Sequence, residues 1–190
     1  PPETILSHHF YETHKAEFFD FYRQKMLAPD AQPNAAHRKL AELERAGKLK
    51  AVITQNIDGL HQKAGSREVL ELHGSVLRNY CEKCGKFYGL ETILHSEGVP
   101  RCSCGGTVKP DVVLYEESLD EDVMDRALRY IQSADLLIIG GTSLVVYPAA
   151  WLVRYFRGRH LVVINKGETG GRVGADLTID GPIGEVLSQV

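Results

Sequence analysis

The sequence predicts an α/β fold: a doubly wound, Rossmann-like parallel sheet into which a small zinc-knuckle module is inserted. Short aliphatic runs alternate with helical patterns along most of the chain, the order of elements in such sheets. Residues 136–139 and 161–164 are apolar without interruption, which is typical of parallel strands covered on both faces. All four cysteines fall within residues 80–107, which hold few large aliphatic side chains. Such a segment buries little core, so it needs a cross-link such as a bound metal to be stable.

Helical spacing and capping residues predict the individual elements. Phe18, Phe21, Tyr22 and Met26 recur on one helical face, and Asn34 is suited to cap the helix that follows. The expected order is helix 12–27, helix 34–47, strand 51–54, strand 69–72, strand 112–115, helix 120–133, strand 136–139, helix 148–156, strand 161–164, strand 175–179 and a last helix from Pro182 with Ile183, Val186, Leu187 and Val190 on one face.

Polar or glycine-rich segments follow three of these strands, at residues 55–61, 140–143 and 165–170. Ligands of doubly wound sheets bind at the carboxyl ends of the strands, so these segments are candidate binding sites. Neither a G-x-G-x-x-G nor a Walker motif occurs in the sequence. In the first of these segments, the Gln and Asn side chains can form hydrogen bonds with ribose hydroxyls, and the Asp carboxylate can accept a hydrogen bond from an amide. The alternative is a turn whose polar side chains bond only to the backbone of the turn itself.

The cysteines form a Cys81-x-x-Cys84 pair and a Cys102-x-Cys104 pair. Four thiolates suit tetrahedral zinc, and a structural site of this kind stabilises a small module. The one-residue gap in the second pair is tighter than usual, which predicts some distortion of the ligation. Two pairs of buried thiols without metal are the alternative.

His73 lies at the end of a predicted strand, next to Gly74. A histidine can serve as a general base near neutral pH. A single histidine is more often structural than catalytic, but its place at a strand end makes His73 the strongest candidate among eight histidines.

The composition is that of an ordinary globular protein. The 190 residues are 43% hydrophobic, and 22 Lys and Arg against 25 Asp and Glu give a net charge of −3. No strong field would attract nucleic acid or an anionic membrane, so neither is an expected partner. The cytoplasm is the expected location.

Six segments together resemble the sirtuin family, bacterial type. They occur in the family's order and read TQNIDGLHQKAG (54–65), ELHGS (71–75), CEKC (81–84), VKPDVVLYEE (108–117), GGTSLVVYPAA (140–150) and VINKGET (163–169). The resemblance implies an NAD-dependent protein-lysine deacylase that gives nicotinamide, free lysine and O-acyl-ADP-ribose. It also implies that acyl-lysine proteins or peptides are the substrates.

The resemblance assigns roles to individual positions. His73 matches the catalytic base, Asn56 acts with it, and Val113 and Tyr115 match the strand that pairs with the substrate peptide. The positions implied to bind NAD are Gln55, Asn56, Ile57, Asp58, Gly141, Thr142, Ser143, Asn165, Lys166 and Ile183. The implied zinc ligands are Cys81, Cys84, Cys102 and Cys104. The resemblance also implies two domains. Residues 1–79 and 108–190 form an NAD-binding domain, of which residues 1–37 are mainly helical and belong to a small lobe. Residues 80–107 form a zinc module.

Three features depart from the family pattern. The second cysteine pair is C-x-C where C-x-x-C is usual. Glu116 stands where many members carry glycine, which we expect to alter peptide preference. The family's Gly-Ala-Gly segment is expected before Pro1, in a natural protein longer by about 40–50 residues, one βα unit. Two alternatives stay open: NAD-dependent ADP-ribosyl transfer to protein, and a non-catalytic zinc and partner-binding module.

Overall fold

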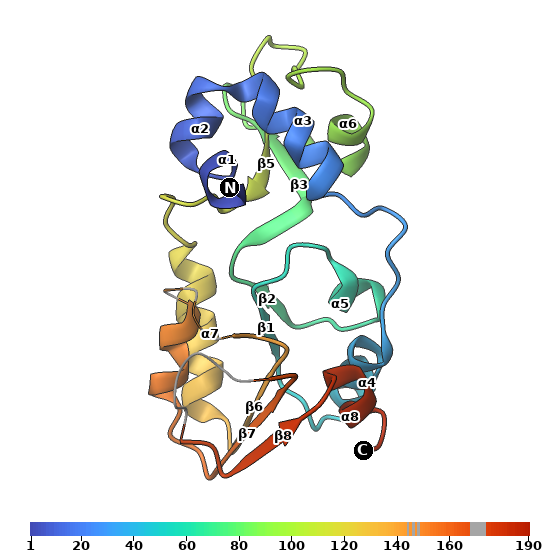
Figure 1. Cartoon of the computed structure of the whole chain (residues 1–190), viewed down its shortest axis with the longest axis vertical. Helices are drawn as coiled ribbons and strands as arrows, with labels where there is room; N and C mark the ends of the chain where they lie inside the picture. Colours follow the sequence, from blue (N-terminus) through green and yellow to red (C-terminus); the bar gives the residue numbers. More distant parts are fainter. Residues whose placement is uncertain (144, 146, 148, 168–173) are drawn as a thin grey trace. The chain divides into compact units, whose positions relative to one another are not determined.

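The computed structural model describes residues 1–143, 145, 147, 149–167 and 174–190, which fold into two compact units (Figure 1). Unit 1 comprises Pro1–Ala31, Thr54–Gly59 and His73–Leu119. Unit 2 comprises Gln32–Ile53, Leu60–Leu72 and Asp120–Val190. The assignment of residues 80–107 to a zinc module and of the remainder to an NAD-binding domain stays a prediction.

The helices of unit 1 differ from the expected single helix over residues 12–27. They are α1 (Pro2–Ile5), α2 (His8–Thr13), α3 (Lys15–Lys25) and α6 (Leu90–Leu94). The prediction was wrong because His14, with φ −136° and ψ 49°, interrupts the helix. Phe21 is half-buried, whereas Phe18 and Tyr22 are fully buried as expected. Phe19, which was not predicted on the buried face, is also buried, and Tyr11 of α2 meets both Phe18 and Phe19 edge-on.

Unit 1 contains an antiparallel sheet in the order β4-β3-β5. Its strands are β3 (Gly74–Cys81), β4 (Phe87–Tyr88) and β5 (Val108–Val112). The strand predicted over residues 112–115 therefore ends earlier than expected. The backbone turns away because Leu114 N–H donates to the Glu117 carboxylate and Glu117 N–H donates to Leu114 O, at 2.9 and 3.0 Å.

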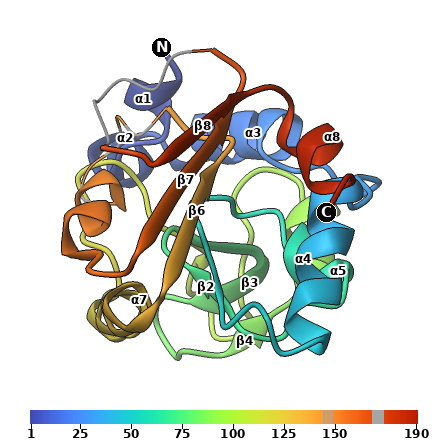
Figure 2. The same cartoon turned by 90° about the horizontal axis from the view of Figure 1, so that it is seen from below.

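Unit 2 contains the predicted parallel strands. They are β6 (Leu136–Gly140), β7 (His160–Asn165) and β8 (Leu177–Asp180), paired in that order (Figure 2). The two short strands predicted near residues 51–54 and 69–72 are present as β1 (Val52–Thr54) and β2 (Val69–Glu71), and they pair with each other in a separate two-stranded sheet. The expectation that β6 is covered on both faces was wrong: Leu136 is 48% and Ile138 37% exposed. Among the described residues β6 is an edge strand, with a neighbour on one side only.

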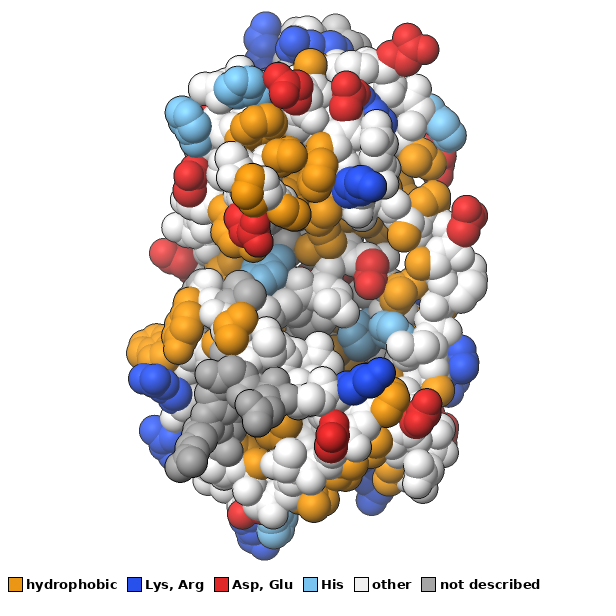
Figure 3. All heavy atoms as spheres, viewed as in Figure 1, with side chains coloured by type: hydrophobic (Ala, Val, Ile, Leu, Met, Phe, Trp, Pro, Cys, Tyr) orange, Lys and Arg blue, Asp and Glu red, His pale blue; other side chains and the backbone are white. Residues whose placement is uncertain are grey.

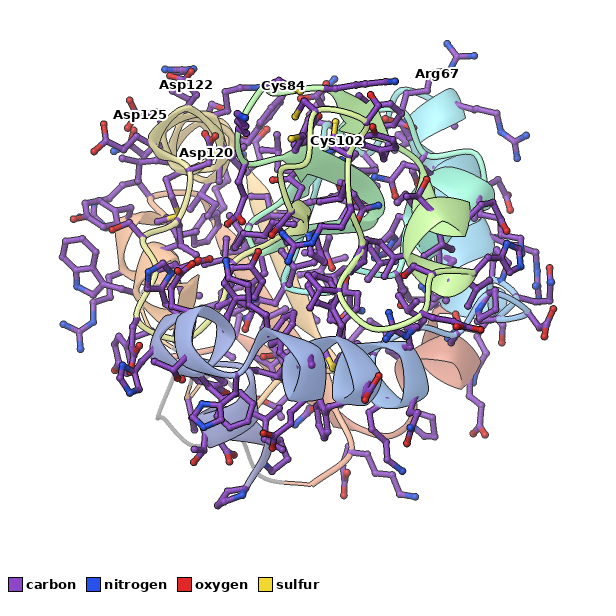
Figure 4. All side chains as sticks on the ribbon, turned by 90° about the horizontal axis from the view of Figure 1, so that it is seen from above. Arg67, Cys84, Cys102, Asp120, Asp122 and Asp125 are labelled. Carbon is purple, nitrogen blue, oxygen red and sulfur yellow. The ribbon has the colours of Figure 1, made fainter. Side chains whose placement is uncertain are left out.

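The remaining described helices belong to unit 2. They are α4 (Ala35–Arg45), α5 (Leu60–Lys63), α7 (Glu121–Ser133), the 3-10 helix η1 (Ala149–Tyr155) and α8 (Ile183–Leu187). The predicted cap at Asn34 is confirmed, since its side chain accepts from His37 N–H in a capping box. Figure 4 shows Asp120, Asp122 and Asp125 around the N-terminal end of α7, where negative charge is favourable.

Two further predictions concern the C-terminal helices. Helix α8 ends at Leu187, so Val190 is 73% exposed and not on a buried face as expected. A 3-10 helix occupies most of the range predicted as helix 148–156, and Pro148 lies outside the described residues.

Two surface properties complete the description. Acidic and basic side chains are interspersed on the face shown in Figure 3. Of the helices in the described parts of the chain, none has the length and apolar character that a membrane span requires.

Candidate functional site

His73 is held in one orientation by a backbone carbonyl. Its Nδ1 lies 3.1 Å from the carbonyl oxygen of Gln55. A carbonyl can only accept a hydrogen bond, so Nδ1 carries the proton of the neutral ring and Nε2 keeps its lone pair. The carbonyl oxygen of His73 accepts from Val113 N–H at 3.0 Å, and the side chain is half-buried. A neutral imidazole fixed in this way can accept a proton at Nε2.

Gly74 makes the position of His73 possible. Its φ is +76°, and a Cβ built there would lie only 1.9 Å from the carbonyl oxygen of Asp111 on β5. Any other residue would push the two strands apart. The sequence Glu71-Leu72-His73-Gly74 therefore encodes a turn that brings the histidine against the backbone of Gln55.

The segment after β1 alternates between packed and exposed residues. Ile57 packs against the core of unit 1, and its carbonyl accepts from Val76 N–H at 3.0 Å. Asn56 and Asp58 are exposed, while Asn56 N–H donates to the Thr54 hydroxyl at 3.0 Å. The structure thus brings Gln55, Asn56, Ile57 and Asp58 together with His73 in unit 1.

The predicted peptide-binding positions follow β5. Val113 is half-buried and hydrogen-bonded to His73, whereas Tyr115 is 50% exposed. Tyr115 forms a parallel bridge with Ser7: its N–H donates to Leu6 O and its carbonyl accepts from His8 N–H, at 3.0 and 2.9 Å. One edge of this extended residue is thus already paired within unit 1.

Unit 2 contains a cavity of about 600 Å³ at the carboxyl ends of β6 and β7. Four of the predicted NAD-binding positions line it, namely Gly141, Asn165, Lys166 and Ile183. The other lining residues are Asn34, Ala35, Gly181, Pro182, Gly184, Glu185 and Ser188. Its size suits a small-molecule ligand, with an amide and an ammonium group for hydroxyls and the Ile183 side chain for a flat apolar ring.

Thr142 and Ser143 lie just beyond β6 but are not among the residues that line this cavity. Thr142 is half-buried and Ser143 is exposed. The predicted NAD-binding positions are therefore divided: residues 55–58 belong to unit 1, and the positions from Gly141 to Ile183 belong to unit 2.

The four cysteines of unit 1 converge. The sulfur atoms of Cys81, Cys84, Cys102 and Cys104 all lie within 4.8 Å of one another, with Cys81 and Cys104 at 3.4 Å and Cys84 and Cys102 at 3.6 Å. The Cys84 and Cys102 side chains are labelled in Figure 4. Ligands of a tetrahedral Zn²⁺ with bonds of about 2.3 Å lie about 3.8 Å apart. The geometry fits zinc despite the one-residue gap of the second pair.

The surroundings of the sulfurs shift the pKa values of the thiols in opposite directions. Hydrogen bonds from the Cys104 N–H and then the Tyr88 hydroxyl lower the pKa of the Cys102 thiol to about 5. The Lys86 N–H lowers the pKa of Cys84, but hydrogen bonds with the other three sulfurs outweigh it and raise that pKa to about 12. Four thiolates this close repel one another, and a divalent cation removes that repulsion. Gly106 keeps room for the cluster, since a Cβ there would lie 2.6 Å from the Cys81 sulfur.

Sequence reasoning missed several residues of these sites. Tyr88 donates to the Cys102 sulfur at 3.0 Å, and no spacing rule points to it. Asn34 was identified as a helix cap but also lines the cavity of unit 2. Helix N-termini present unpaired N–H groups, so the predicted cap was a usable signal for a ligand-facing residue.

Comparison with known proteins identifies the family. The sequence profile described as "Sir2 family" matches residues 1–148. The chain is a member of the Sir2 family. A sirtuin of Clostridium acetobutylicum named "NAD-dependent protein deacetylase" is 58% identical over 192 residues, covering 100% of this chain and 78% of the relative. One from Cutibacterium acnes with the same name is 60% identical over 190 residues, with the same coverage.

Solved sirtuin structures share the fold. A structure described as "Sir2 bound to acetylated peptide" has a TM-score of 0.89 and 40% identity, covering 98% of this chain and 81% of that one. A structure described as a "Sir2 homolog-NAD complex" has a TM-score of 0.92 and 39% identity, covering 99% and 75%. The predicted family and the predicted α/β fold with a four-cysteine site that fits zinc are therefore confirmed.

Proposed function

We infer that the chain is an NAD-dependent protein-lysine deacetylase that gives nicotinamide, free lysine and O-acyl-ADP-ribose. The observation that carries this conclusion is 58–60% identity over the whole chain to bacterial proteins with that name. No observation favours the two alternatives weighed from the sequence.

His73 is the proposed general base. The Gln55 carbonyl holds the proton on Nδ1, so Nε2 can take a proton from a hydroxyl placed against it. NAD, when bound, would supply the ribose that accepts the acyl group on one of its oxygens and the nicotinamide that leaves. Asn56, exposed beside Gln55, is the proposed partner of His73 in ordering the reacting groups.

The proposed NAD contacts fall into two sets. In unit 1, Gln55 and Asn56 offer amides to ribose hydroxyls, while Ile57 and Asp58 flank the nicotinamide. In unit 2 the cavity lined by Asn165, Lys166 and Ile183 suits the adenosine part. Gly141, Thr142 and Ser143, at the end of β6, are the proposed contacts for phosphate and ribose.

The proposed substrate is a peptide containing acyl-lysine. Val113 and Tyr115 lie on an extended segment tied to His73, so a peptide paired there would place its lysine near the base. A solved relative at 40% identity is described as bound to acetylated peptide, which supports this substrate class.

The four cysteines are proposed to hold a structural zinc ion. All four ligand positions come from the protein, which leaves none open for substrate. The cysteines carry no disulfide, which suits a reducing compartment, so we propose that the protein acts in the cytoplasm.

The test is incubation of the natural full-length protein with NAD and an acetyl-lysine peptide, following peptide mass and nicotinamide release together. Equal loss of the acetyl group and gain of nicotinamide, with O-acetyl-ADP-ribose as product, is the expected result. Nicotinamide release with a gain in protein mass equal to ADP-ribose would instead support ADP-ribosyl transfer. Absence of any turnover would contradict the enzyme assignment.

A further inference from the structure

Glu116 has an unusual backbone conformation. Its φ is +76°, and it is the one residue other than glycine with positive φ within the described ranges. A side chain in the left-handed region is strained and persists only where surrounding contacts enforce it. Glu116 is exposed, so burial of its side chain does not enforce this conformation.

Two carboxylates fix this turn to the start of α2. The Oε2 atom of Glu116 accepts from His9 N–H at 2.9 Å. The neighbouring Glu117 accepts from Leu114 N–H at 2.9 Å and lies 3.0 Å from Nδ1 of His8. The Glu116 contact offsets the strain of its own backbone, because the hydrogen bond from His9 N–H ties the side chain to the start of α2.

The turn sets the direction of the segment that precedes it. Tyr115 is bridged to Ser7 on one edge, and Val113 is bonded to the carbonyl of His73. A change of φ at Glu116 would move the end of this segment away from the Ser7 bridge.

We propose that Glu116 is a positioning residue for the peptide substrate: its carboxylate, held by His9 N–H, enforces the left-handed turn that presents the Val113–Tyr115 segment. The proposal rests on the proposed function, in which this segment pairs with the substrate peptide. It predicts that Glu116 affects peptide affinity and leaves NAD binding and the chemical step unchanged.

The experiment compares Glu116→Ala, Glu116→Gln and Glu116→Gly in the natural full-length protein, with Glu91→Ala as the matched control. Glu91 is an exposed glutamate of the same unit, paired only with the exposed His95 in the described contacts. Affinity for a fluorescent acetyl-lysine peptide of about ten residues is measured by anisotropy, and KM and kcat are measured in parallel. A single blocked acetyl-lysine serves as a competitor that cannot pair along a strand.

Glu116→Ala is expected to weaken peptide affinity and raise peptide KM about tenfold, with kcat and the KM for NAD within about twofold. Affinity for the single blocked acetyl-lysine stays unchanged. Glu116→Gln keeps an oxygen acceptor for His9 N–H, and Glu116→Gly adopts positive φ without strain, so both remain within about threefold of the parent. Glu91→Ala behaves as the parent.

Equal peptide affinity in Glu116→Ala and the parent would overturn the proposal. Equal losses in Glu116→Gln and Glu116→Ala would also overturn it, because they would assign the effect to charge. If Glu116→Ala does not fold, Glu116→Gly still tests the proposal, because a loss of peptide affinity of about tenfold in a variant that keeps positive φ would contradict it. Peptide binding is measured without turnover. Inactivity of the parent protein would therefore contradict the deacetylase assignment and leave the test of Glu116 intact.

Discussion

At the scale of single residues, His73 is the position on which the proposed chemistry depends. Its Nδ1 faces the Gln55 carbonyl at 3.1 Å, which leaves Nε2 as the proton acceptor. His73→Ala is expected to lower kcat about 10²–10⁴-fold, while NAD affinity changes by less than about fivefold. Steady-state deacetylation and NAD titration measure the two effects.

A second histidine provides the control for this prediction. His95 is exposed, and its described ion-pair partner, Glu91, is exposed as well. His95→Ala should therefore keep full activity. Unchanged turnover in His73→Ala would remove His73 from the mechanism.

Glu44 gives a prediction about acid stability. Its carboxylate accepts from the N–H groups of Glu68 and Arg67, each at 2.7 Å, and these bonds lower its pKa. A carboxylate with a lowered pKa in the folded state contributes stability that is complete above the unfolded value of about 4.3. That contribution is lost as pH falls through the lower folded pKa.

Glu44→Gln should lower the thermal midpoint by about 2–4 °C at pH 7, because one amide oxygen cannot replace two carboxylate oxygens. The difference from the parent should shrink between about pH 5 and pH 3, where the parent loses its own contribution. Thermal melts across this range measure both effects. A difference that stays constant with pH would contradict the role given to the Glu44 charge.

At the scale of elements, the cysteine cluster is expected to hold unit 1 together. Cys81→Ser should remove zinc and lower the thermal midpoint by about 5 °C or more, because metal binding contributes directly to folding. Metal content by atomic absorption and a thermal melt test this. The control is Ser103→Ala, which lies between two ligands and should retain zinc. Unchanged zinc and midpoint in Cys81→Ser would contradict a structural metal.

The sequence predicted some elements well for a physical reason. The strands β6 and β7 are continuous aliphatic runs that read as parallel strands, and they pair in that way. Strand β3 was missed because its buried positions do not alternate and include the polar residues Ser75 and Asn79. Its pairing with β5 shifts register between these two residues, so no period of two marks it.

The candidate site was also only partly predictable from the sequence. Segments at the ends of strands could be identified as ligand-facing, because topology fixes where strand ends meet. The contact between His73 and Gln55 could not be predicted, since the acceptor is a backbone carbonyl and carries no side-chain signature. The role of Asn34 in lining the cavity was not predicted because Asn34 is distant in sequence from Asn165, although its predicted helix cap was a usable signal.

At the scale of the whole molecule, each unit is assembled from three separate stretches of chain. No composition change marks these stretches, because tertiary contacts decide how they interleave. The surplus of acidic over basic residues is small, and both signs are interspersed on the face in Figure 3.

Binding of NAD should stabilise the folded protein as a whole. A ligand at about 100 times its Kd adds roughly 2.7 kcal/mol, which corresponds to about 5–10 °C in the midpoint of a protein of this size. Lys166→Ala is expected to weaken NAD affinity about three- to tenfold, because Lys166 lines the cavity in unit 2.

The rise of the thermal midpoint with increasing NAD concentration measures the NAD affinity of the parent protein and of Lys166→Ala. Lys48→Ala is the control, since Lys48 is an exposed lysine of the same unit and does not line the cavity. Equal affinities in Lys166→Ala and Lys48→Ala would argue against Lys166 as an NAD contact.

The acceptor that orients His73 has an evolutionary consequence. No single substitution at Gln55 can delete a main-chain oxygen, so mutation at that codon changes the amide side chain and leaves the imidazole oriented. Mutation in this segment can disturb the tautomer only if it moves the main chain between Thr54 and Asp58. In a saturation library, selection for turnover should therefore tolerate exchanges at Gln55 better than insertions or deletions in this stretch, which shift the carbonyl itself.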